Sequence, residues 1–300
     1  MSMHNLFVLH TQKTLIGCSG VLFAMKEGIL YLQRFDIGRE FIKLTAMITM
    51  TIDHLGAIIY PEFIILRIIG RLSFPLYSYL IVLGIESTRN TTNYFVRLFL
   101  FAVISQVPYC LAFGFGPFES LNIFFTLSFG VVFIIFLFPL KKQSLLCLLP
   151  ILASFVLNFD YGLYGIALIG CMFVLKTHTK TGIFLSILLN GLFLSFQRIT
   201  TFQILSLFAF PIILLHKSGV LKIETEINAK AVYLSLIKYF FYVYYPLHLT
   251  LFYLIKLWGI AARQCWVGWS RVISQTHTSK DNSRYCKCAC VVCFDVLFGV

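Results

Sequence analysis

The sequence predicts an all-α fold, a polytopic helical bundle in a membrane with about nine transmembrane helices, within a range of about eight to ten. Composition is the first reason: 59% of the 300 residues are hydrophobic, 12% are charged, and the mean hydropathy is +0.88. Soluble domains have about 25% charged residues, so a domain folded in water is excluded. The second reason is that apolar runs recur along the chain, and the third is that cations gather in alternate connections between these runs.

Nine apolar runs are the candidate spans, because a helix needs about 20 residues to cross a bilayer. They are residues 41–60, 64–85, 94–113, 121–140, 145–158, 161–175, 182–196, 202–215 and 231–257. The domain organisation that follows has a cytoplasmic or interfacial leader (1–39), a transmembrane domain (40–260) and a cysteine-rich tail (261–300), which we expect to be unstructured. The tail carries Cys286, Cys288, Cys290 and Cys293, but their spacing lacks the two separated pairs of a structural zinc site, so we expect no metal.

The positions of lysine and arginine predict the orientation. One set of connections contains Arg34, Arg39, Lys43, Arg89, Arg97, Lys141, Lys142, Lys176, Lys180, Lys217, Lys222 and Lys230, whereas the alternate set contains Arg198 alone. Cytoplasmic loops of membrane proteins are enriched in these residues, so the N-terminus is predicted to be cytoplasmic. The same distribution accounts for the net charge of +12 without a nucleic-acid partner.

Ionisable residues are predicted to gather at one depth, in the outer part of the bundle. An aspartate at the centre of a membrane helix costs about 2.5–3.5 kcal/mol, so Asp53 and His54 in the first span call for an explanation. The other polar residues at this level are Arg67, Arg71, Glu119, Asn122, Asp160, Tyr161, Gln197, Arg198, Gln203, Tyr245 and His248. A shared cavity explains their common depth, and Arg71 is the expected partner of Asp53. The alternatives are a purely structural Asp–Arg bridge, an Arg67 side chain that reaches the headgroups, and histidines that are only packed in the core.

Six segments, taken in order, resemble the TraX family of multi-spanning membrane proteins, which is associated with N-terminal acetylation of conjugative pilin. They are "ITMTIDHLGAII", "LRIIGRLSFPLYSYLIVLGIESTRN", "YFVRLFLFAVISQVPY", "LNIFFTLSFG", "DYGLYG" and "KYFFYVYYPLHL", and the resemblance extends from about residue 40 to 257. It implies an integral-membrane acetyltransferase of the inner membrane that takes its acyl group from acetyl-CoA. Pilin or another envelope molecule would then be the acceptor, through an amine or a hydroxyl group.

Acyl transfer to an amine suggests a role for each of these side chains. His54 is the candidate general base, because a histidine titrates near neutral pH. Arg71 is the candidate stabiliser of the developing oxyanion, Asp53 its organiser, and His248 a second base or substrate contact. The candidate substrate-binding residues are Arg67, Asn122, Asp160, Tyr161 and Tyr245, and the candidate residues for the CoA pyrophosphate are Arg89 and Arg97.

Two other functional classes are consistent with the same residues. A secondary transporter also gathers ionisable groups within the membrane, but it predicts two related halves, and the sequence has no internal repeat. A non-catalytic membrane factor in pilus or conjugation assembly predicts that His54 and Arg71 tolerate substitution.

Overall fold

The computed structural model of the chain describes residues 30–137, 142–195, 201–221, 224–230 and 239–260. Most of the predicted leader, the cysteine-rich tail, Gln197 and Arg198 lie outside these residues.

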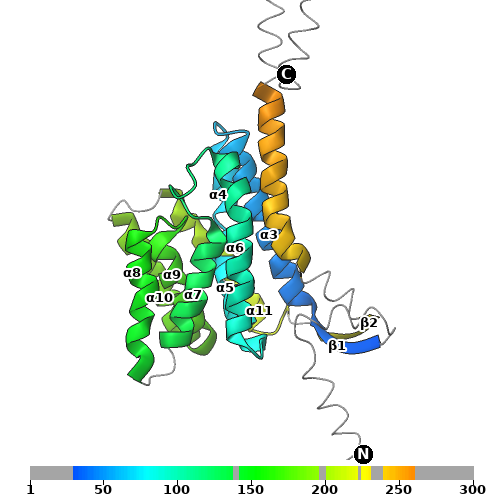
Figure 1. Ribbon diagram of the computed structural model, residues 1–300. Coiled ribbons are helices and arrows are strands. Elements are labelled where there is room, and N and C mark those ends of the chain that lie inside the picture. The colour runs from blue at the N-terminus through cyan, green and yellow to red at the C-terminus, as the bar shows by residue number, and fades with distance from the viewer. Residues whose placement is uncertain (1–29, 138–141, 196–200, 222–223, 231–238, 261–300) are drawn as a thin grey trace, which may run out of the picture.

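The described chain is a bundle of helices with one short β-ribbon (Figure 1). In chain order the elements are β1 (Leu30–Asp36), α3 (Ile37–Ile58), α4 (Ile64–Gly70), α5 (Ser73–Ser87), α6 (Thr91–Phe113), α7 (Ile123–Leu137), the 3₁₀ helix η1 (Lys142–Cys147), α8 (Leu148–Val156), α9 (Gly162–Thr177), α10 (Thr179–Ser195), the 3₁₀ helix η2 (Thr201–Ala209), α11 (Phe210–Lys217), β2 (Glu224–Lys230) and a last helix, 239–260. The two strands pair antiparallel, with Leu30 opposite Lys230 and Asp36 opposite Glu224. This ribbon was not predicted, and it stands beside a bundle that is otherwise helical.

A helix or a broken helix stands at each of the nine predicted spans within the described residues, so the helical class is confirmed. Three of these helices are long and apolar enough to cross a membrane, namely Ile37–Ile58, Ile64–Ser87 (α4 and α5 together) and Thr91–Phe113. Others, such as α7 and α9, are apolar but shorter. The eighth predicted span begins as the 3₁₀ helix η2 rather than as an α-helix, and continues as α11.

The second predicted span is interrupted at Arg71 and Leu72. Pro75 has no backbone N–H and so cannot bond to the carbonyl of Arg71, four residues earlier. The N–H groups of Arg71 and Leu72 bond to carbonyls three residues back, at 3.1 Å and 3.3 Å, which is the tighter 3₁₀ spacing. The break therefore lies at the arginine that was predicted to be functional.

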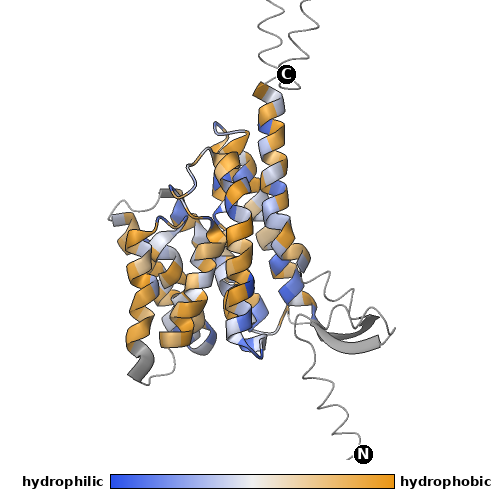
Figure 2. Cartoon of the chain, in the orientation of Figure 1, coloured by the Kyte–Doolittle hydropathy of each residue, from blue (hydrophilic) through white to orange (hydrophobic). Residues whose placement is uncertain are grey.

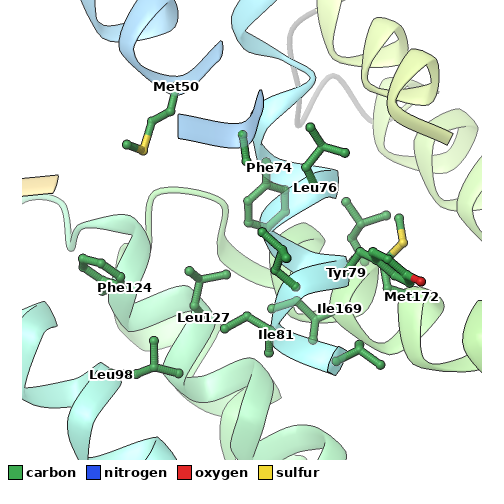
Figure 3. Close-up of a cluster of buried hydrophobic side chains, with 14 of the residues drawn as sticks. Met50, Phe74, Leu76, Tyr79, Ile81, Leu98, Phe124, Leu127, Ile169 and Met172 are labelled. Atoms are coloured by element: carbon green, nitrogen blue, oxygen red, sulfur yellow. The ribbon is translucent and has the colours of Figure 1, made fainter. Parts of the chain in front are cut away.

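Helix α5 is the centre of the bundle, packed against α3, α7, α9 and η2. Its side chains are buried almost all round, and Leu76, Tyr79 and Val82 have no exposed surface. Figure 3 shows Phe74, Tyr79 and Ile81 of this helix among side chains from α6, α7 and α9. Because a helix that is apolar on every face must be enclosed, this pattern agrees with the composition of the segment.

The outer helices turn apolar side chains away from the protein. Val107 of α6, Phe155 of α8 and Leu247 of helix 239–260 are 65%, 72% and 60% exposed. Hydrophobic residues predominate along these helices (Figure 2). Such large exposed apolar surfaces are suited to lipid rather than to water, so the chain is a membrane protein.

The predicted basic connections meet at one end of the bundle. Arg39 at the start of α3 donates a hydrogen bond to Ser87 (3.1 Å), Lys176 pairs with Glu86 (2.8 Å), and Lys217 donates to the Leu175 carbonyl (2.6 Å). Figure 1 shows α11 beside the beginning of α3 at this end. We call it the basic end below.

Candidate functional site

A cavity of about 930 Å³ lies toward the other end of the bundle, where the predicted polar residues gather. Its walls come from α3, α4, α5, α8, α9, α10 and η2, with contributions from the end of α6 and the start of α7. The polar lining residues are Asp53, His54, Arg67, Arg71, Ser73, Tyr77, Ser154, Asn158, Asp160, Tyr161, Tyr164 and Gln203. The aromatic and apolar lining residues include Phe74, Phe113, Phe159 and Phe193. Polar groups that converge in a largely aromatic cavity are typical of a small-molecule or substrate site.

Asp53 binds two arginines at once. One carboxylate oxygen, Oδ2, is 2.6 Å from Nη1 of Arg67, and the other, Oδ1, is 2.9 Å from Nη2 of Arg71. Arg71 was the predicted partner, whereas Arg67 was expected either to bind substrate or to reach the headgroups. Three charged groups together carry one net positive charge on this wall. Since both carboxylate oxygens are engaged, Asp53 holds the two guanidinium groups side by side.

Gly70 allows this cluster to form, because the end of α4 lies directly against Asp53. A Cβ atom at position 70 would be 2.2 Å from the Cβ of Asp53 and 2.3 Å from its Oδ1, well inside van der Waals contact. Asp53 cannot move away without losing one of its two arginines. A glycine at this position is thus a requirement of the ion-pair geometry.

We expect Gly70→Ala to displace the Asp53 carboxylate and to destabilise the protein by about 1–3 kcal/mol, the usual range for overpacking. Thermal unfolding of the detergent-solubilised protein measures this. Gly191→Ala in α10 is the matched control, because nothing lies within 4 Å of a Cβ built there. The control should be neutral or more stable by up to about 1 kcal/mol, as alanine is the better helix former. Equal stability of the two variants would contradict the close contact.

Arg71 is held by a chain of hydrogen bonds from the far side of the cavity. Its Nη1 donates to Oε1 of Gln203 (3.2 Å), and Nε2 of Gln203 lies 3.3 Å from the hydroxyl of Tyr164. The Tyr164 hydroxyl donates to Oδ1 of Asn190 at 3.1 Å, and Asn190 is 1% exposed. Buried polar groups that satisfy one another in this way fix the side chains that they join. The guanidinium of Arg71 is therefore positioned by α9, α10 and η2 as well as by Asp53.

His54 and His248 form a hydrogen-bonded pair behind the cavity wall. Nδ1 of His54 is 2.7 Å from Nε2 of His248, and Nδ1 of His248 is 2.8 Å from the carbonyl oxygen of Tyr244. The imidazole planes are nearly parallel, at 6°, with centroids 5.0 Å apart. His54 lines the cavity, whereas His248 contacts it only through His54. Neither histidine bonds to Asp53 in the described structure, which agrees with the 100° offset between neighbouring helical positions.

Asp160 faces the same cavity from the connection between α8 and α9. Its backbone N–H donates to the Leu121 carbonyl (2.9 Å), but its carboxylate has no hydrogen bond or ion pair with a described residue. The side chain is exposed at the cavity. Burial raises the pKa of the Asp160 carboxyl from its ordinary value of 3.8 to about 6. The charge of Asp53 adds to this rise, and those of the two arginines oppose it.

The structure places the remaining predicted site residues as follows. Tyr161 lines the cavity, and its ring stacks on that of Phe74 with centroids 3.9 Å apart. Asn122 is fully buried; its amide donates to the Ala102 carbonyl (2.7 Å) and its Oδ1 accepts from the N–H of Phe124, so it ties α7 to α6 and does not line the cavity.

Tyr245 is also buried, at 2% exposure, and packs edge-on against His54 and His248 rather than on the cavity wall.

The two arginines predicted to bind the CoA pyrophosphate line neither of the two described cavities. Nε of Arg97 lies 3.3 Å from the Tyr242 hydroxyl, and its guanidinium sits over the rings of Tyr94 and Tyr242. Arg89 lies in the connection between α5 and α6, near the basic end of the bundle. No group of three or more potential metal ligands occurs within the described part of the chain.

Several residues of the site were not predicted. Tyr164 follows Tyr161 by one helical turn, a spacing that could have suggested a shared face of α9. Asn190 carries no such indication, because it is a single polar residue in an apolar run. Tyr77 carries none either, because it stands beside Ser78 and Tyr79 and nothing in the sequence distinguishes it from them. Their roles depend on contacts between helices that are far apart in the sequence.

The family model described as "TraX protein" matches residues 38–256, which include every side chain of the cavity. The chain belongs to the TraX family. Among curated proteins, this TraX-family chain is 29% identical over 148 residues to "Probable fimbrial assembly protein FimC, serogroup H1" of Dichelobacter nodosus, covering 45% of the chain and 61% of that protein.

It is also 31% identical over 96 residues to an uncharacterized protein of Rickettsia prowazekii (strain Madrid E), covering 32% of the chain and 36% of that protein. The matched segments thus span less than two thirds of either relative. No solved structure matches the chain.

Proposed function

We propose that this TraX-family protein is an integral membrane acetyltransferase. It would transfer an acetyl group from acetyl-CoA to an amine or hydroxyl group of a pilin or another envelope substrate. The observation that carries the proposal is the arrangement on one cavity wall, where an imidazole with a free nitrogen lies beside a net-positive Asp53–Arg67–Arg71 cluster. Acyl transfer needs both a proton acceptor and an electrostatic partner for the oxyanion.

The hydrogen-bond chain supports His54 as the proton acceptor. A backbone carbonyl can only accept, so Nδ1 of His248 donates its proton to Tyr244. In the neutral pair, Nε2 of His248 then carries a lone pair and accepts the proton of His54 Nδ1. Nε2 of His54 is left unprotonated, and it has no hydrogen-bond partner among the described residues. His54 is therefore set up as the base, and His248 is a positioning residue that holds its tautomer.

The arginine cluster can stabilise negative charge on the reacting carbonyl oxygen. Arg71 has five N–H donors, and its contacts with Asp53, Gln203 and the Arg67 carbonyl use three of them. Arg67 directs Nη1 to Asp53 and keeps its Nε and Nη2 donors free of described partners. Donors that are already in place need no reorganisation when charge develops, which is the basis of electrostatic catalysis.

The wall of the cavity that carries Asp160 favours a cationic acceptor. The Asp160 carboxylate is free of described partners and lines the same cavity as the rings of Phe159, Tyr161 and Phe74. A carboxylate next to aromatic faces attracts an ammonium group. His54 would remove a proton from this ammonium, the resulting amine would attack the acyl carbonyl through its lone pair, and the C–S bond would break with the thiolate of CoA as leaving group. This supports an amine acceptor over a hydroxyl group.

The pH dependence of acceptor binding tests this assignment of Asp160. Its native pKa is raised to about 6, so protonation favours the folded state at low pH, and this contribution is lost as the pH rises through about 6. The affinity for a cationic acceptor depends on pH in the opposite sense: it falls as the pH falls, because binding requires the ionised carboxylate. We expect KM for the acceptor to rise about tenfold as the pH falls below about 6. In Asp160→Asn, KM should be high and flat across this range, and a wild-type profile in that variant would contradict the assignment.

The orientation completes the proposal. The protein would lie in a bacterial inner membrane with the basic end and the N-terminus in the cytoplasm, because cytoplasmic connections are enriched in lysine and arginine. Acetyl-CoA, a cytoplasmic donor, would then enter from the basic end, with Arg89 and Arg97 as contacts for its pyrophosphate. The acceptor would reach the cavity from the opposite side.

A direct assay tests the function. Purified protein in nanodiscs is mixed with isotopically labelled acetyl-CoA and the envelope fraction of a strain that lacks the gene, and intact-mass spectrometry follows the label. Label that appears on a pilin or another envelope molecule only with active protein supports the proposal.

The alternative is a non-catalytic assembly factor. Its only support is the name of the Dichelobacter relative, a probable fimbrial assembly protein. It predicts that pili still depend on the gene while no labelled product forms. A transporter predicts neither labelled product nor loss of assembly.

A further inference from the structure

A second cavity, of about 330 Å³, lies at the basic end of the bundle. It is formed where α3 and α11 meet the ends of α5 and α9. It is lined by Asp36, Arg39, Tyr79, Leu83, Glu86, Ser87, Lys176, His216 and Lys217. Arg39 and Asp53 are separated by 14 positions on α3, or about 21 Å at 1.5 Å per residue, so the two cavities are distinct.

The charged groups of this cavity leave one positive charge in excess. Two carboxylates are matched: Asp36 accepts a hydrogen bond from His216 (3.1 Å), and Glu86 pairs with Lys176 (2.8 Å). The pair with Lys176 is weak, because its side chains are 42% and 31% exposed, so Glu86 can be displaced at little cost. Lys217 donates to the Leu175 carbonyl at the edge of the cavity.

Arg39 supplies the observation that points to a ligand. Its Nη1 donates to Ser87 (3.1 Å), but its Nε atom is buried and has no hydrogen-bond partner among the described residues. The Nη2 group of Arg39 also has no hydrogen-bond partner among the described residues, and Arg39 lines the cavity. A guanidinium with unused donors favours a bound acceptor, because unpaired donors in the interior are costly.

We infer that this cavity binds a phosphate group. Phosphate oxygens only accept hydrogen bonds, and a planar guanidinium is the side chain that suits them best. Arg39 would bind the phosphate through its free N–H groups, with Ser87 beside it, while Lys176 leaves Glu86 to complete the site. The volume is within the lower range of small-ligand pockets. The phosphate belongs either to an anionic lipid headgroup or to a soluble phosphate ester.

The experiment separates these two sources and needs no acyl-transfer activity. Protein in phosphatidylcholine nanodiscs is titrated with adenosine 3′,5′-bisphosphate and with inorganic pyrophosphate, and binding is followed by calorimetry. In a second arm, phosphatidylglycerol replaces part of the phosphatidylcholine, and the unfolding temperature is measured. Binding in the first arm identifies a soluble phosphate compound as the ligand. Stabilisation in the second arm alone identifies a lipid headgroup.

Three variants show whether the effect belongs to this cavity. Arg39→Gln should weaken binding, or remove the lipid stabilisation, by about tenfold or more, since a hydrogen bond to a charged group is lost. Lys176→Gln should weaken it several-fold without harming the fold, because the only described partner of Lys176 is the exposed Glu86. Lys180→Gln is the control: Lys180 is exposed at the same end and does not line the cavity.

A control variant that weakens binding as much as Arg39→Gln would show only nonspecific attraction to a basic surface, and would overturn the inference. Absence of binding in both arms would overturn it as well. A wild-type affinity in both Arg39→Gln and Lys176→Gln would place the phosphate elsewhere and have the same consequence.

Discussion

Replacement of His54 by alanine is expected to lower acetyl transfer by about 10²–10⁴-fold, the usual contribution of a general base. The reason is that Nε2 of His54 is the nitrogen left free to accept a proton on the cavity wall. The variant should still insert into the membrane, because a neutral imidazole anchors no charge there. The loss should appear in kcat at saturating acceptor, measured with labelled acetyl-CoA in nanodiscs.

Two further variants make this result specific. His54→Asn can keep a hydrogen bond to His248 but cannot act as a base, so it should be as inactive as the alanine variant. His178→Ala is the matched control, because His178 is exposed at the end of α9 and does not line the cavity. Transfer at the wild-type rate by either His54 variant would reject the base assignment. His248→Ala should cause a smaller loss, since it removes only the group that orients His54.

Asp53→Asn is expected to cost about 3–5 kcal/mol of stability, because it leaves both arginines without their carboxylate in the interior. Arg71→Gln should cost less, because Asp53 keeps its ion pair with Arg67. The side chains of Asp53 and Arg71 are 12% and 11% exposed. In Asp53→Asn the two arginines face each other and the cluster has a net charge of two. In Arg71→Gln the charges of Asp53 and Arg67 cancel, and the cluster has no net charge. The double variant restores the single net charge of the native cluster. We expect it to be more stable than the sum of the single changes by about 1–3 kcal/mol.

A thermal-unfolding cycle on the detergent-solubilised protein measures this coupling. The matched control is the cycle Glu86→Gln with Lys176→Gln, which removes an ion pair of similar length, 2.8 Å, on the exposed surface. Its coupling should not exceed about 1 kcal/mol. Additive losses in the Asp53–Arg71 cycle would show that the buried cluster does not act as a unit, and they would remove the basis for treating it as a pre-formed anion site.

The sequence by itself determined the class of the protein and, to a large extent, which residues line the cavity. Composition required a membrane bundle, and the spacing of apolar runs placed the helices, because a bilayer imposes one length on every span. The cost of burying charge required that Asp53 have a cationic partner, and Arg71 was identified as that partner from its depth alone. Asp160 and Tyr161 were placed at the cavity by the same argument of depth.

The tertiary structure decided which of the residues at that depth meet. Depth along a helix says nothing about the direction in which a side chain points or about which helices are neighbours. Asn122 and Tyr245 lie at the predicted level, but the packing of α6, α7 and helix 239–260 buries both away from the cavity.

The His54–His248 pair joins residues 194 positions apart, and Gln203, Tyr164 and Asn190 come from three separate elements. Contacts of this kind arise from the three-dimensional packing of apolar faces, which many sequences with the same periodicity would arrange differently.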